Sequence, residues 1–339
     1  MAKRAIFDKK NILVVGGAGF IGSHLCDELV GENKVICLDN FLTGQEDNIS
    51  HLYQDPNFEF INHDITKPVD LEKEPSLKTL RVEFQGVQEI YFLASPTSPR
   101  NYLEKPIETM QVNSLGLVNC LELAAKYKAK FVYVSGPAVY GHDGIKGPVT
   151  EDFIGTVDQL GTRGCYSESL RFGEALVNNY RIQYDLDTKI VRAFNIYGPR
   201  MKLSDGRMVP EFIKRALDNE EIIIYGDKKS VGSYCYVMDV TKALTKIMDD
   251  GNSGPFNVGS DWQTKFSEVA QKVVELTGSS SKISFSEMDS SMATQLIPVI
   301  AKVKDQLGWF PIVLLEEGLK ETIDYLNAQQ DVLSPEQLN

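Results

Sequence analysis

The feature that most constrains this chain is a short apolar segment that runs directly into closely spaced glycines. Residues 11–15, Asn-Ile-Leu-Val-Val, predict a buried strand, Gly-Gly-Ala-Gly-Phe-Ile-Gly follows at 16–22, and a helix-compatible segment occupies 23–30. In such a unit the glycine backbone can approach a pyrophosphate closely, and the helix N-terminus offers free N–H groups to the phosphates. The segment therefore predicts a dinucleotide-binding site.

A second apolar run, residues 34–38, ends at Asp39, about twenty residues beyond the glycines. A carboxylate in that place accepts hydrogen bonds from an adenosine ribose. It also repels a 2′-phosphate, and no arginine follows it directly, so NAD is favoured over NADP. The competing interpretation is an ordinary turn with a surface aspartate. The ordered succession of strand, glycines, helix, strand and acid disfavours it.

Apolar strand runs recur up to residue 194 and are mostly separated by amphipathic segments of helix length. The predicted strands are 11–15, 34–38, 58–61, 89–93, 130–135 and 188–194, and the clearest helix is 107–127. This alternation predicts an α/β fold with a Rossmann-like, doubly wound parallel sheet. Beyond Gly198 the elements become shorter, with helices at 208–219 and 237–249 and strands at 221–225 and 254–258.

We therefore expect three parts. Residues 1–198 should form the dinucleotide-binding domain, to which some later segments return. Residues 199–327 should form mainly a smaller substrate-binding lobe, laid over the carboxyl ends of the strands, where open α/β sheets bind ligands. Residues 328–339 are expected to be a loosely ordered tail.

Composition excludes several classes of function. A net charge of −12 and a pI near 5.0 argue against a nucleic-acid surface. The first ten residues lack an apolar leader and no run of about eighteen apolar residues occurs, so neither a signal peptide nor a membrane span is expected. The 5 cysteines are odd in number and widely spaced, without metal-ligand spacing. They predict reduced thiols, no metal site and a cytoplasmic location.

Further segments, spread over almost the whole chain, form a recognisable set. They are Leu-Asp-Asn-Phe at 38–41 with Thr43 and Gly44, Asn-His-Asp-Ile at 62–65, Leu-Ala-Ser-Pro-Thr-Ser-Pro at 93–99, Val-Tyr-Gly at 139–141, Cys-Tyr at 165–166, Phe-Asn-Ile-Tyr-Gly-Pro-Arg-Met at 194–201 and Leu-Gly-Trp at 307–309. With the glycine segment, they resemble the extended short-chain dehydrogenases/reductases of the NAD-dependent epimerase/dehydratase family. Among these, the resemblance is strongest to the UDP-glucuronate decarboxylases.

The resemblance implies NAD as cofactor, a UDP-sugar as substrate and a homodimer built on a four-helix bundle from 107–127 and the helix that begins near Tyr166. It also implies a cycle in which the sugar C4 is oxidised, the β-keto acid loses CO2 and hydride returns to C4. The implied cofactor contacts are Gly16, Gly19, Phe20, Ile21, Gly22, Asp39, Asn40, Phe41, Thr43, Gly44, Asp64, Ile65, Leu93, Ala94, Ser95 and Tyr166, and the implied substrate contacts are Pro96, Asn195 and Arg200.

The resemblance breaks at the catalytic positions. Family members use a Tyr-x-x-x-Lys pair, in which the lysine lowers the pKa of the tyrosine that takes the C4 hydroxyl proton. Tyr166 fits the first position, and Leu170 occupies the second. A phenol of pKa about 10 is ionised about one part in a thousand at pH 7, so losing the lysine costs up to about 4 kcal/mol. The family's catalytic hydroxyl and carboxylate are expected to fall on Pro137 and Ala138, and two of its arginines on Gly232 and Leu296.

Three functions stay open on this pattern. The chain can be a working nucleotide-sugar enzyme that decarboxylates UDP-glucuronate or acts as a C4 epimerase or oxidoreductase. It can instead bind NAD and a nucleotide sugar without turnover, or have a pocket rebuilt for another ligand. His142 is a candidate replacement acid or base, although a loop histidine is more often simply solvated. The loss of catalytic positions amid retained cofactor positions favours impaired catalysis.

Overall fold

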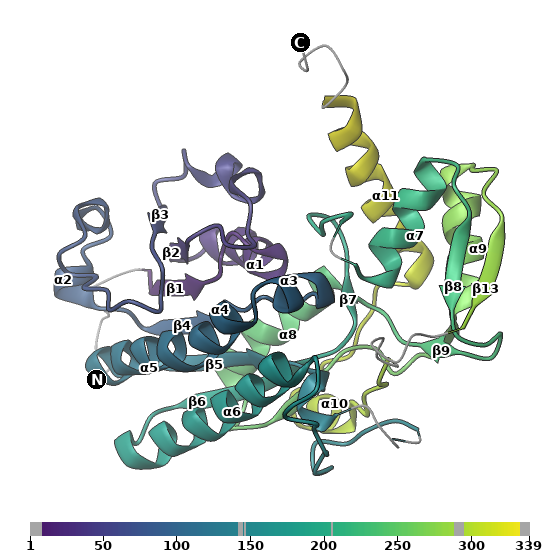
Figure 1. The fold of residues 1–339 in the computed structure, drawn as a ribbon. Helices are drawn as coiled ribbons and strands as arrows, with labels where there is room; N and C mark the ends of the chain where they lie inside the picture. Colours follow the sequence, from purple (N-terminus) through teal and green to yellow (C-terminus); the bar gives the residue numbers. More distant parts are fainter. Residues whose placement is uncertain (1–8, 142–144, 146, 205, 288–294, 333–339) are drawn as a thin grey trace.

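The computed structural model describes residues 9–141, 145, 147–204, 206–287 and 295–332 (Figure 1). Its central sheet has seven parallel strands in the order β11-β6-β5-β4-β1-β2-β3. Their bounds are β1 Asn11–Val15, β2 Lys34–Asp39, β3 Phe58–Asn62, β4 Glu89–Phe92, β5 Lys130–Ser135, β6 Thr188–Ala193 and β11 Phe256–Val258. The predicted doubly wound α/β fold is confirmed. The strand order reverses beside β1, which is where such sheets bind ligands.

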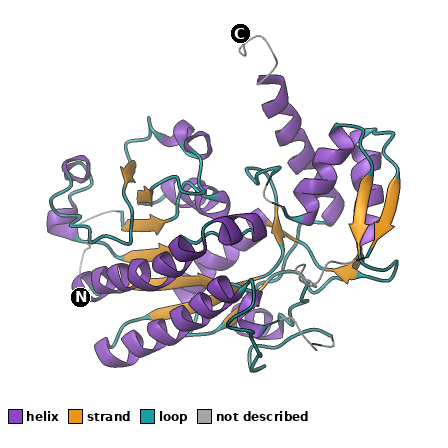
Figure 2. Cartoon of the chain, viewed as in Figure 1, coloured by secondary structure: helices purple, strands orange, loops and turns teal. Residues whose placement is uncertain are grey.

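Helices cover both faces of this sheet (Figure 2). One layer contains α1 (Phe20–Val30) and α8 (Val237–Asp250), and the other contains α4 (Pro106–Gln111), α5 (Leu117–Tyr127) and α6 (Gly164–Tyr184). Alternate residues of β1 explain the arrangement: Ile12 and Val14 pack into the first layer, and Leu13 and Val15 into the second. The strand is apolar throughout because both of its faces are buried.

The helix predicted at 107–127 contains a π-helical turn, Val112–Gly116, between α4 and α5. Such turns insert an extra residue and often occur at functional sites. Here the turn buries Asn113, whose Nδ2 donates to Ser95 Oγ at 3.0 Å and to Ser169 Oγ at 3.1 Å. The turn therefore joins this helix to the end of β4 and to α6.

Residues beyond 199 contribute to two regions. A separate group of elements, on the right in Figure 1, contains α7 (Met208–Leu217), β8 (Ile222–Tyr225), β9 (Val231–Gly232), β12 (Thr264–Lys265), α9 (Phe266–Thr277) and β13 (Ile283–Ser286). We call this group the second lobe. In contrast, β11 pairs with β6 and α8 packs against α1, so both belong to the central sheet and its layers. The remaining elements are α2 (Val82–Gln85), α3 (Pro99–Glu104), β7 (Ile196–Tyr197), β10 (Cys235–Tyr236), α10 (Ala301–Leu307) and α11 (Leu315–Val332).

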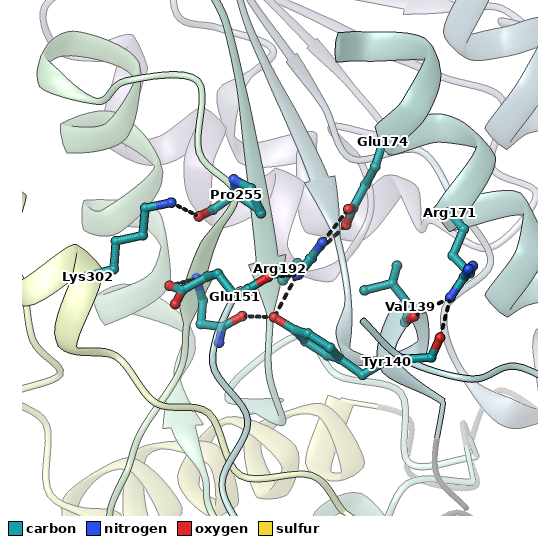
Figure 3. Close-up of polar contacts among 10 residues, drawn as sticks. Val139, Tyr140, Glu151, Arg171, Glu174, Arg192, Pro255 and Lys302 are labelled. Atoms are coloured by element: carbon teal, nitrogen blue, oxygen red, sulfur yellow. Dashed lines mark hydrogen bonds and ion pairs between the residues drawn. The ribbon is translucent and has the colours of Figure 1, made fainter. Parts of the chain in front are cut away.

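A charged network is buried near the carboxyl end of β6 (Figure 3). Arg192 Nε and Nη2 donate to the two carboxylate oxygens of Glu174 at 2.9 and 2.6 Å. Arg192 Nη1 donates to Tyr140 Oη at 2.7 Å, and Tyr140 Oη donates to Asn257 Oδ1 at 2.7 Å. The network joins β6, α6, β11 and residues 137–140, which follow β5. It therefore holds residues 137–140 in place at the carboxyl end of the sheet.

Candidate functional site

One cavity of ≈ 1090 Å³ lies at the carboxyl ends of the central strands and continues to the second lobe. At one end its lining includes Gly16 and Asp39, and at the other Tyr225, Tyr234 and Phe266. Pockets for a single small ligand are typically about 300–1,000 Å³. The cavity is therefore large enough for more than one small ligand.

The glycine segment has the close packing that a dinucleotide site requires. Gly16 has φ +83°, and a Cβ built on Gly22 would lie 2.1 Å from the Gly16 carbonyl oxygen. Any side chain at Gly22 would push the start of α1 away from the loop. Gly19 provides no side-chain cap for α1, so the helix N-terminus depends on other acceptors. The close backbone packing at Gly16 and Gly22 and the free N–H groups at the start of α1 fit a pyrophosphate.

Asp39 connects β2 to the glycine segment. Its Oδ2 accepts from the Ala18 N–H at 3.0 Å, and its Oδ1 accepts from the Phe41 N–H at 2.8 Å. Burial raises the pKa of Asp39, and the backbone N–H groups act in the opposite direction. The carboxylate also lines the cavity. Each oxygen keeps a further lone pair, so the group can also accept from ribose hydroxyls.

Most residues of the predicted site come together around this cavity. Its lining includes Gly16, Gly19, Phe20, Ile21, Gly22, Asp39, Asn40, Thr43, Asp64, Ile65, Leu93, Ala94, Ser95, Pro96, Tyr166, Asn195 and Arg200. Phe41 and Gly44 are not among the lining residues: Phe41 packs on Phe60 with ring centroids 5.0 Å apart, and a Cβ on Gly44 would lie 3.0 Å from Ala18. Asn195 donates its amide to the Leu296 carbonyl at 2.9 Å.

Tyr166 lies in the first turn of α6, and its ring is stacked on Tyr102 of α3 with centroids 4.9 Å apart and an interplanar angle of 5°. Burial raises the pKa of Tyr166 to about 12, although the positive charge of Arg207 acts to lower it. Leu170 follows one helical turn later and is 1% exposed, within the apolar core. The phenol is therefore protonated at neutral pH, as a hydrogen-bond donor.

The segment after β5 places Gly136 beside the Tyr166 hydroxyl. A Cβ built on Gly136 would lie 3.3 Å from Tyr166 Oη and 3.8 Å from Leu170 Cδ1. Pro137 and Ala138, which the resemblance suggested for the family's hydroxyl and carboxylate, also line the cavity. We call Gly136, Pro137, Ala138, Tyr166 and Leu170 the Tyr166 corner. A side chain at position 136 would contact the Tyr166 hydroxyl, but glycine has no side chain to make that contact.

On the lobe side, Gly232 and Leu296 are both buried. A Cβ on Gly232 would lie 2.2 Å from Gln295 Oε1 and 2.9 Å from Tyr234 Oη, so these side chains fill the room that a longer residue would need. The cavity lining includes Gln295 and Tyr234, whereas Gly232 and Leu296 are not among its lining residues. This part of the cavity therefore presents an amide and a phenol where the resemblance suggested guanidinium groups.

Sequence reasoning missed Tyr102 and Arg207, and it did not place Gly136 against Tyr166. Gly136 directly precedes Pro137, and a motif alone does not show which residue faces the tyrosine. Tyr102 follows the Ser-Pro segment and is recognisable only through its stacking. Arg207 donates to Thr97 Oγ1 at 2.6 Å from a segment distant in sequence. His142 lies outside the described residues.

The described part of the chain contains no group of three or more His, Cys, Asp or Glu side chains that could hold a metal ion. Across the same residues, no helix combines the length and the apolar character needed to cross a membrane. The 5 cysteines are all free thiols.

Known proteins share this architecture. Residues 12–259 match the NAD dependent epimerase/dehydratase family. The chain is 38% identical over 323 residues to UDP-glucuronic acid decarboxylase 1 of Xenopus tropicalis, covering 95% of this chain and 73% of that protein. It is 39% identical over 310 residues to UDP-glucuronic acid decarboxylase 6 of Arabidopsis thaliana, covering 91% and 86%.

Among solved structures, the UDP-glucose 4-epimerase of Thermotoga maritima with UDP-glucose has a TM-score of 0.83 and 29% identity, covering 94% of this chain and 99% of that one. The UDP-glucuronic acid 4-epimerase of Bacillus cereus, in complex with UDP-glucuronic acid and NAD, has a TM-score of 0.81 and 26% identity, with the same coverage. The predicted family and cofactor are confirmed. The chain belongs to the NAD dependent epimerase/dehydratase family, uses NAD as its cofactor and is homologous to the UDP-glucuronic acid decarboxylases.

Proposed function

We propose that this protein binds NAD and a UDP-sugar in one cavity and oxidises C4 of UDP-glucuronate very slowly or not at all. The observation that carries the proposal is the Tyr166 corner, where a protonated phenol has Leu170 and Gly136 as neighbours. The retained glycine segment and Asp39 support cofactor binding. Homology to UDP-glucuronic acid decarboxylases supports the class of the sugar ligand.

The expected defect follows from proton transfer. When bound, NAD accepts a hydride from the sugar carbon. The hydroxyl on that carbon must lose its proton in the same step, and Tyr166 is the proposed acceptor. Burial raises the pKa of the phenol to about 12, further from neutral pH than that of an ordinary phenol, so only a very small fraction is ionised at pH 7. General-base catalysis works best when the pKa lies near the operating pH, so C4 oxidation should be severely slowed.

The side chains that would assist the later step of the cycle, the loss of CO2, are missing as well. Ala138 has no group that can transfer a proton, and Leu296 is an apolar residue in the core. Each positioned acid, base or hydrogen-bond donor typically contributes about tenfold to a thousandfold. The losses are therefore expected to combine into a very low rate of decarboxylation.

The test is to incubate the protein with NAD and UDP-glucuronate and to measure three quantities: NAD affinity by calorimetry, UDP-pentose formed, and absorbance of the reduced nicotinamide. We expect NAD binding without pentose. A parallel incubation with UDP-glucose tests C4 epimerisation. Pentose or epimer formed at rates ordinary for an enzyme would overturn the proposal.

A second candidate is a pocket rebuilt for another nucleotide sugar. It is favoured by the small or apolar character of the Tyr166 corner, where Pro137, Ala138 and Leu170 stand at positions that the resemblance makes polar, and Gly136 adds no side chain. Calorimetric comparison of UDP-sugars with and without a carboxylate discriminates the two. Preference for a sugar that lacks the carboxylate would support the second candidate.

Replacing Asp39 by alanine should weaken NAD binding by about tenfold or more, because a charge-assisted hydrogen bond to ribose is lost together with two bonds that brace the loop. Calorimetry checks this. The matched control is Asp47→Ala, which removes an exposed carboxylate from the segment that follows. Equal NAD affinity in both variants would refute the ribose assignment.

We also propose a cytoplasmic homodimer. Free thiols suit a reducing compartment. Apolar side chains are exposed on adjacent helices: Leu115, in the turn between α4 and α5, is 55% exposed and Phe172, on α6, is 50% exposed. These helices contact each other and run side by side in Figure 1. Burial of both side chains against a second copy would remove this apolar surface from water.

Light scattering at micromolar concentration should therefore give the mass of a dimer, and Leu115→Glu should shift it to the monomer, because a charge cannot be buried unpaired at an apolar interface. Phe84→Glu is the matched control, since Phe84 is 77% exposed on α2, which is not one of the helices that carry Leu115 and Phe172. A monomeric unmodified protein would contradict the proposal.

A further inference from the structure

The second lobe gives the cavity an aromatic end. Its lining there includes Tyr225 of β8, Tyr234, and Phe266 at the start of α9. Bases of nucleotides stack readily on aromatic rings. The glycine segment and Asp39, which suit the NAD cofactor, lie at the opposite end of the cavity. The aromatic end therefore suits the base of a second nucleotide, which is the proposed nucleotide sugar.

A diphosphate attached to that base is anionic, and phosphates are bound by positively charged side chains. The two positions at which the resemblance suggested arginines hold Gly232 and Leu296, and both are buried. Gln295 and Tyr234 fill the space beside Gly232. Among the described residues of the second lobe, Lys229 is the one lysine or arginine that lines the cavity.

Lys229 lies in the tight turn that connects β8 to β9. Gly226 begins the turn with φ +122°. The Lys229 N–H donates to Asp227 Oδ1 at 2.6 Å, and the Ser230 N–H donates to the Asp227 carbonyl oxygen at 3.1 Å. These bonds fix the backbone of the turn, and they direct one oxygen of the Asp227 carboxylate to the backbone of Lys229.

The ammonium group of Lys229 is available to a ligand. The residue is exposed, and within the described part of the chain its Nζ makes no hydrogen bond or ion pair. The carboxylate of Glu211, which also lines the cavity from the second lobe, is paired with Arg215 at 2.7 Å. A lysine ammonium is a compact charge on a flexible four-carbon stem, so it can turn toward an anion in the cavity.

The adjacent lysine has a different position. Lys228 Nζ lies 5.7 Å from the centroid of the Phe285 ring on β13, and Lys228 is not among the residues that line the cavity. The turn therefore places Lys229 at the cavity and Lys228 against β13. Two neighbouring lysines of equal charge thus differ in their access to a bound ligand.

We infer that Lys229 binds the diphosphate of the nucleotide sugar and supplies the positive charge that Gly232 cannot. This inference rests on the proposed function and deepens it, because it names the residue of the second lobe that recognises the phosphates. An ammonium binds a phosphate as a point charge, without the paired hydrogen bonds of a guanidinium. Because Lys229 is exposed, its contribution should fall as salt concentration rises.

The test compares Lys229→Met with the unmodified protein by calorimetry, using UDP, uridine and NAD as three separate ligands. Lys229→Met should raise the Kd of UDP by about tenfold at low salt, and by less at about 1 M salt. The affinities for uridine and NAD should stay within about twofold of those of the unmodified protein. Lys229→Arg should retain UDP binding, because it keeps the charge. Lys228→Met is the matched control and should leave all three affinities unchanged.

Circular dichroism of each variant without ligand checks folding, and Lys229→Gln replaces Lys229→Met if the latter does not fold. Unchanged UDP affinity in a folded variant overturns the inference and leaves the proposed function intact. An equal loss in Lys228→Met also overturns it, because the effect would then be one of general charge. So does an equal loss for uridine and UDP, which would place Lys229 on the nucleoside. Failure of the unmodified protein to bind UDP would instead refute the proposed function, and the inference with it.

Discussion

Replacing Leu170 by lysine together with Gly136 by threonine should raise the rate of C4 oxidation of UDP-glucuronate by about a hundredfold or more. The lysine would lie one helical turn from Tyr166 and lower the pKa of the phenol by its charge. The threonine hydroxyl would start from a Cβ 3.3 Å from Tyr166 Oη, close enough to bind the same sugar oxygen. The readout is reduced nicotinamide, because this variant restores only the oxidation step.

Leu170→Lys alone should recover little, because catalytic groups that act as a unit are non-additive. It also places an ammonium in a core position that is 1% exposed. Leu170→Met with Gly136→Ala is the control that changes size without adding chemistry. If the lysine variant alone matched the double variant, Gly136 would have no part in the defect.

The second large effect is on stability. Arg192→Met should lower the free energy of unfolding by about 3–5 kcal/mol, the usual result of removing one partner of a buried ion pair. Arg192 and Glu174 are only 12% and 13% exposed, so the carboxylate would be left charged and poorly solvated. The Tyr140 hydroxyl and the Glu151 carbonyl would each lose a donor too. Urea unfolding measures the difference.

Arg215→Met provides the comparison, because Arg215 pairs with Glu211 in a more exposed i,i+4 contact on α7. Such pairs contribute about 0–1 kcal/mol. Combining Arg192→Met with Glu174→Leu should recover part of the loss, since no unpaired charge remains. A change below about 1 kcal/mol in Arg192→Met would show that the network in Figure 3 contributes little.

The cofactor half was predictable because its signals are local. The glycine segment, β1, β2 and Asp39 are close in sequence, and their spacing follows from one strand-turn-helix-strand unit. The π-helical turn at Val112–Gly116 was not predictable, because one extra residue per turn hardly alters the apolar pattern of a long helix. Its consequence, the bonds from Asn113 to two distant serines, required the structure.

The catalytic half depended on contacts between distant segments. The loss of lysine at Leu170 was visible in the sequence. Which residue faces Tyr166 could not be read from the sequence, because it depends on a shift of one residue, from Pro137 to Gly136. The ion-pair partner of Arg200 could not be read from the sequence either, because Asp27 lies on α1, far from Arg200 along the chain. Side-chain pairing across elements is set by packing, and local patterns do not encode it.

The most direct test of the central claim is a single-turnover experiment with the protein in excess over UDP-glucuronate and with saturating NAD. Calorimetry under the same conditions establishes that both ligands bind. We expect both ligands to bind, while nicotinamide reduction stays at baseline over many minutes and no UDP-pentose forms. A rapid burst of reduced nicotinamide, or conversion of the bound sugar to pentose, would show that Tyr166 is activated after all and would contradict the account.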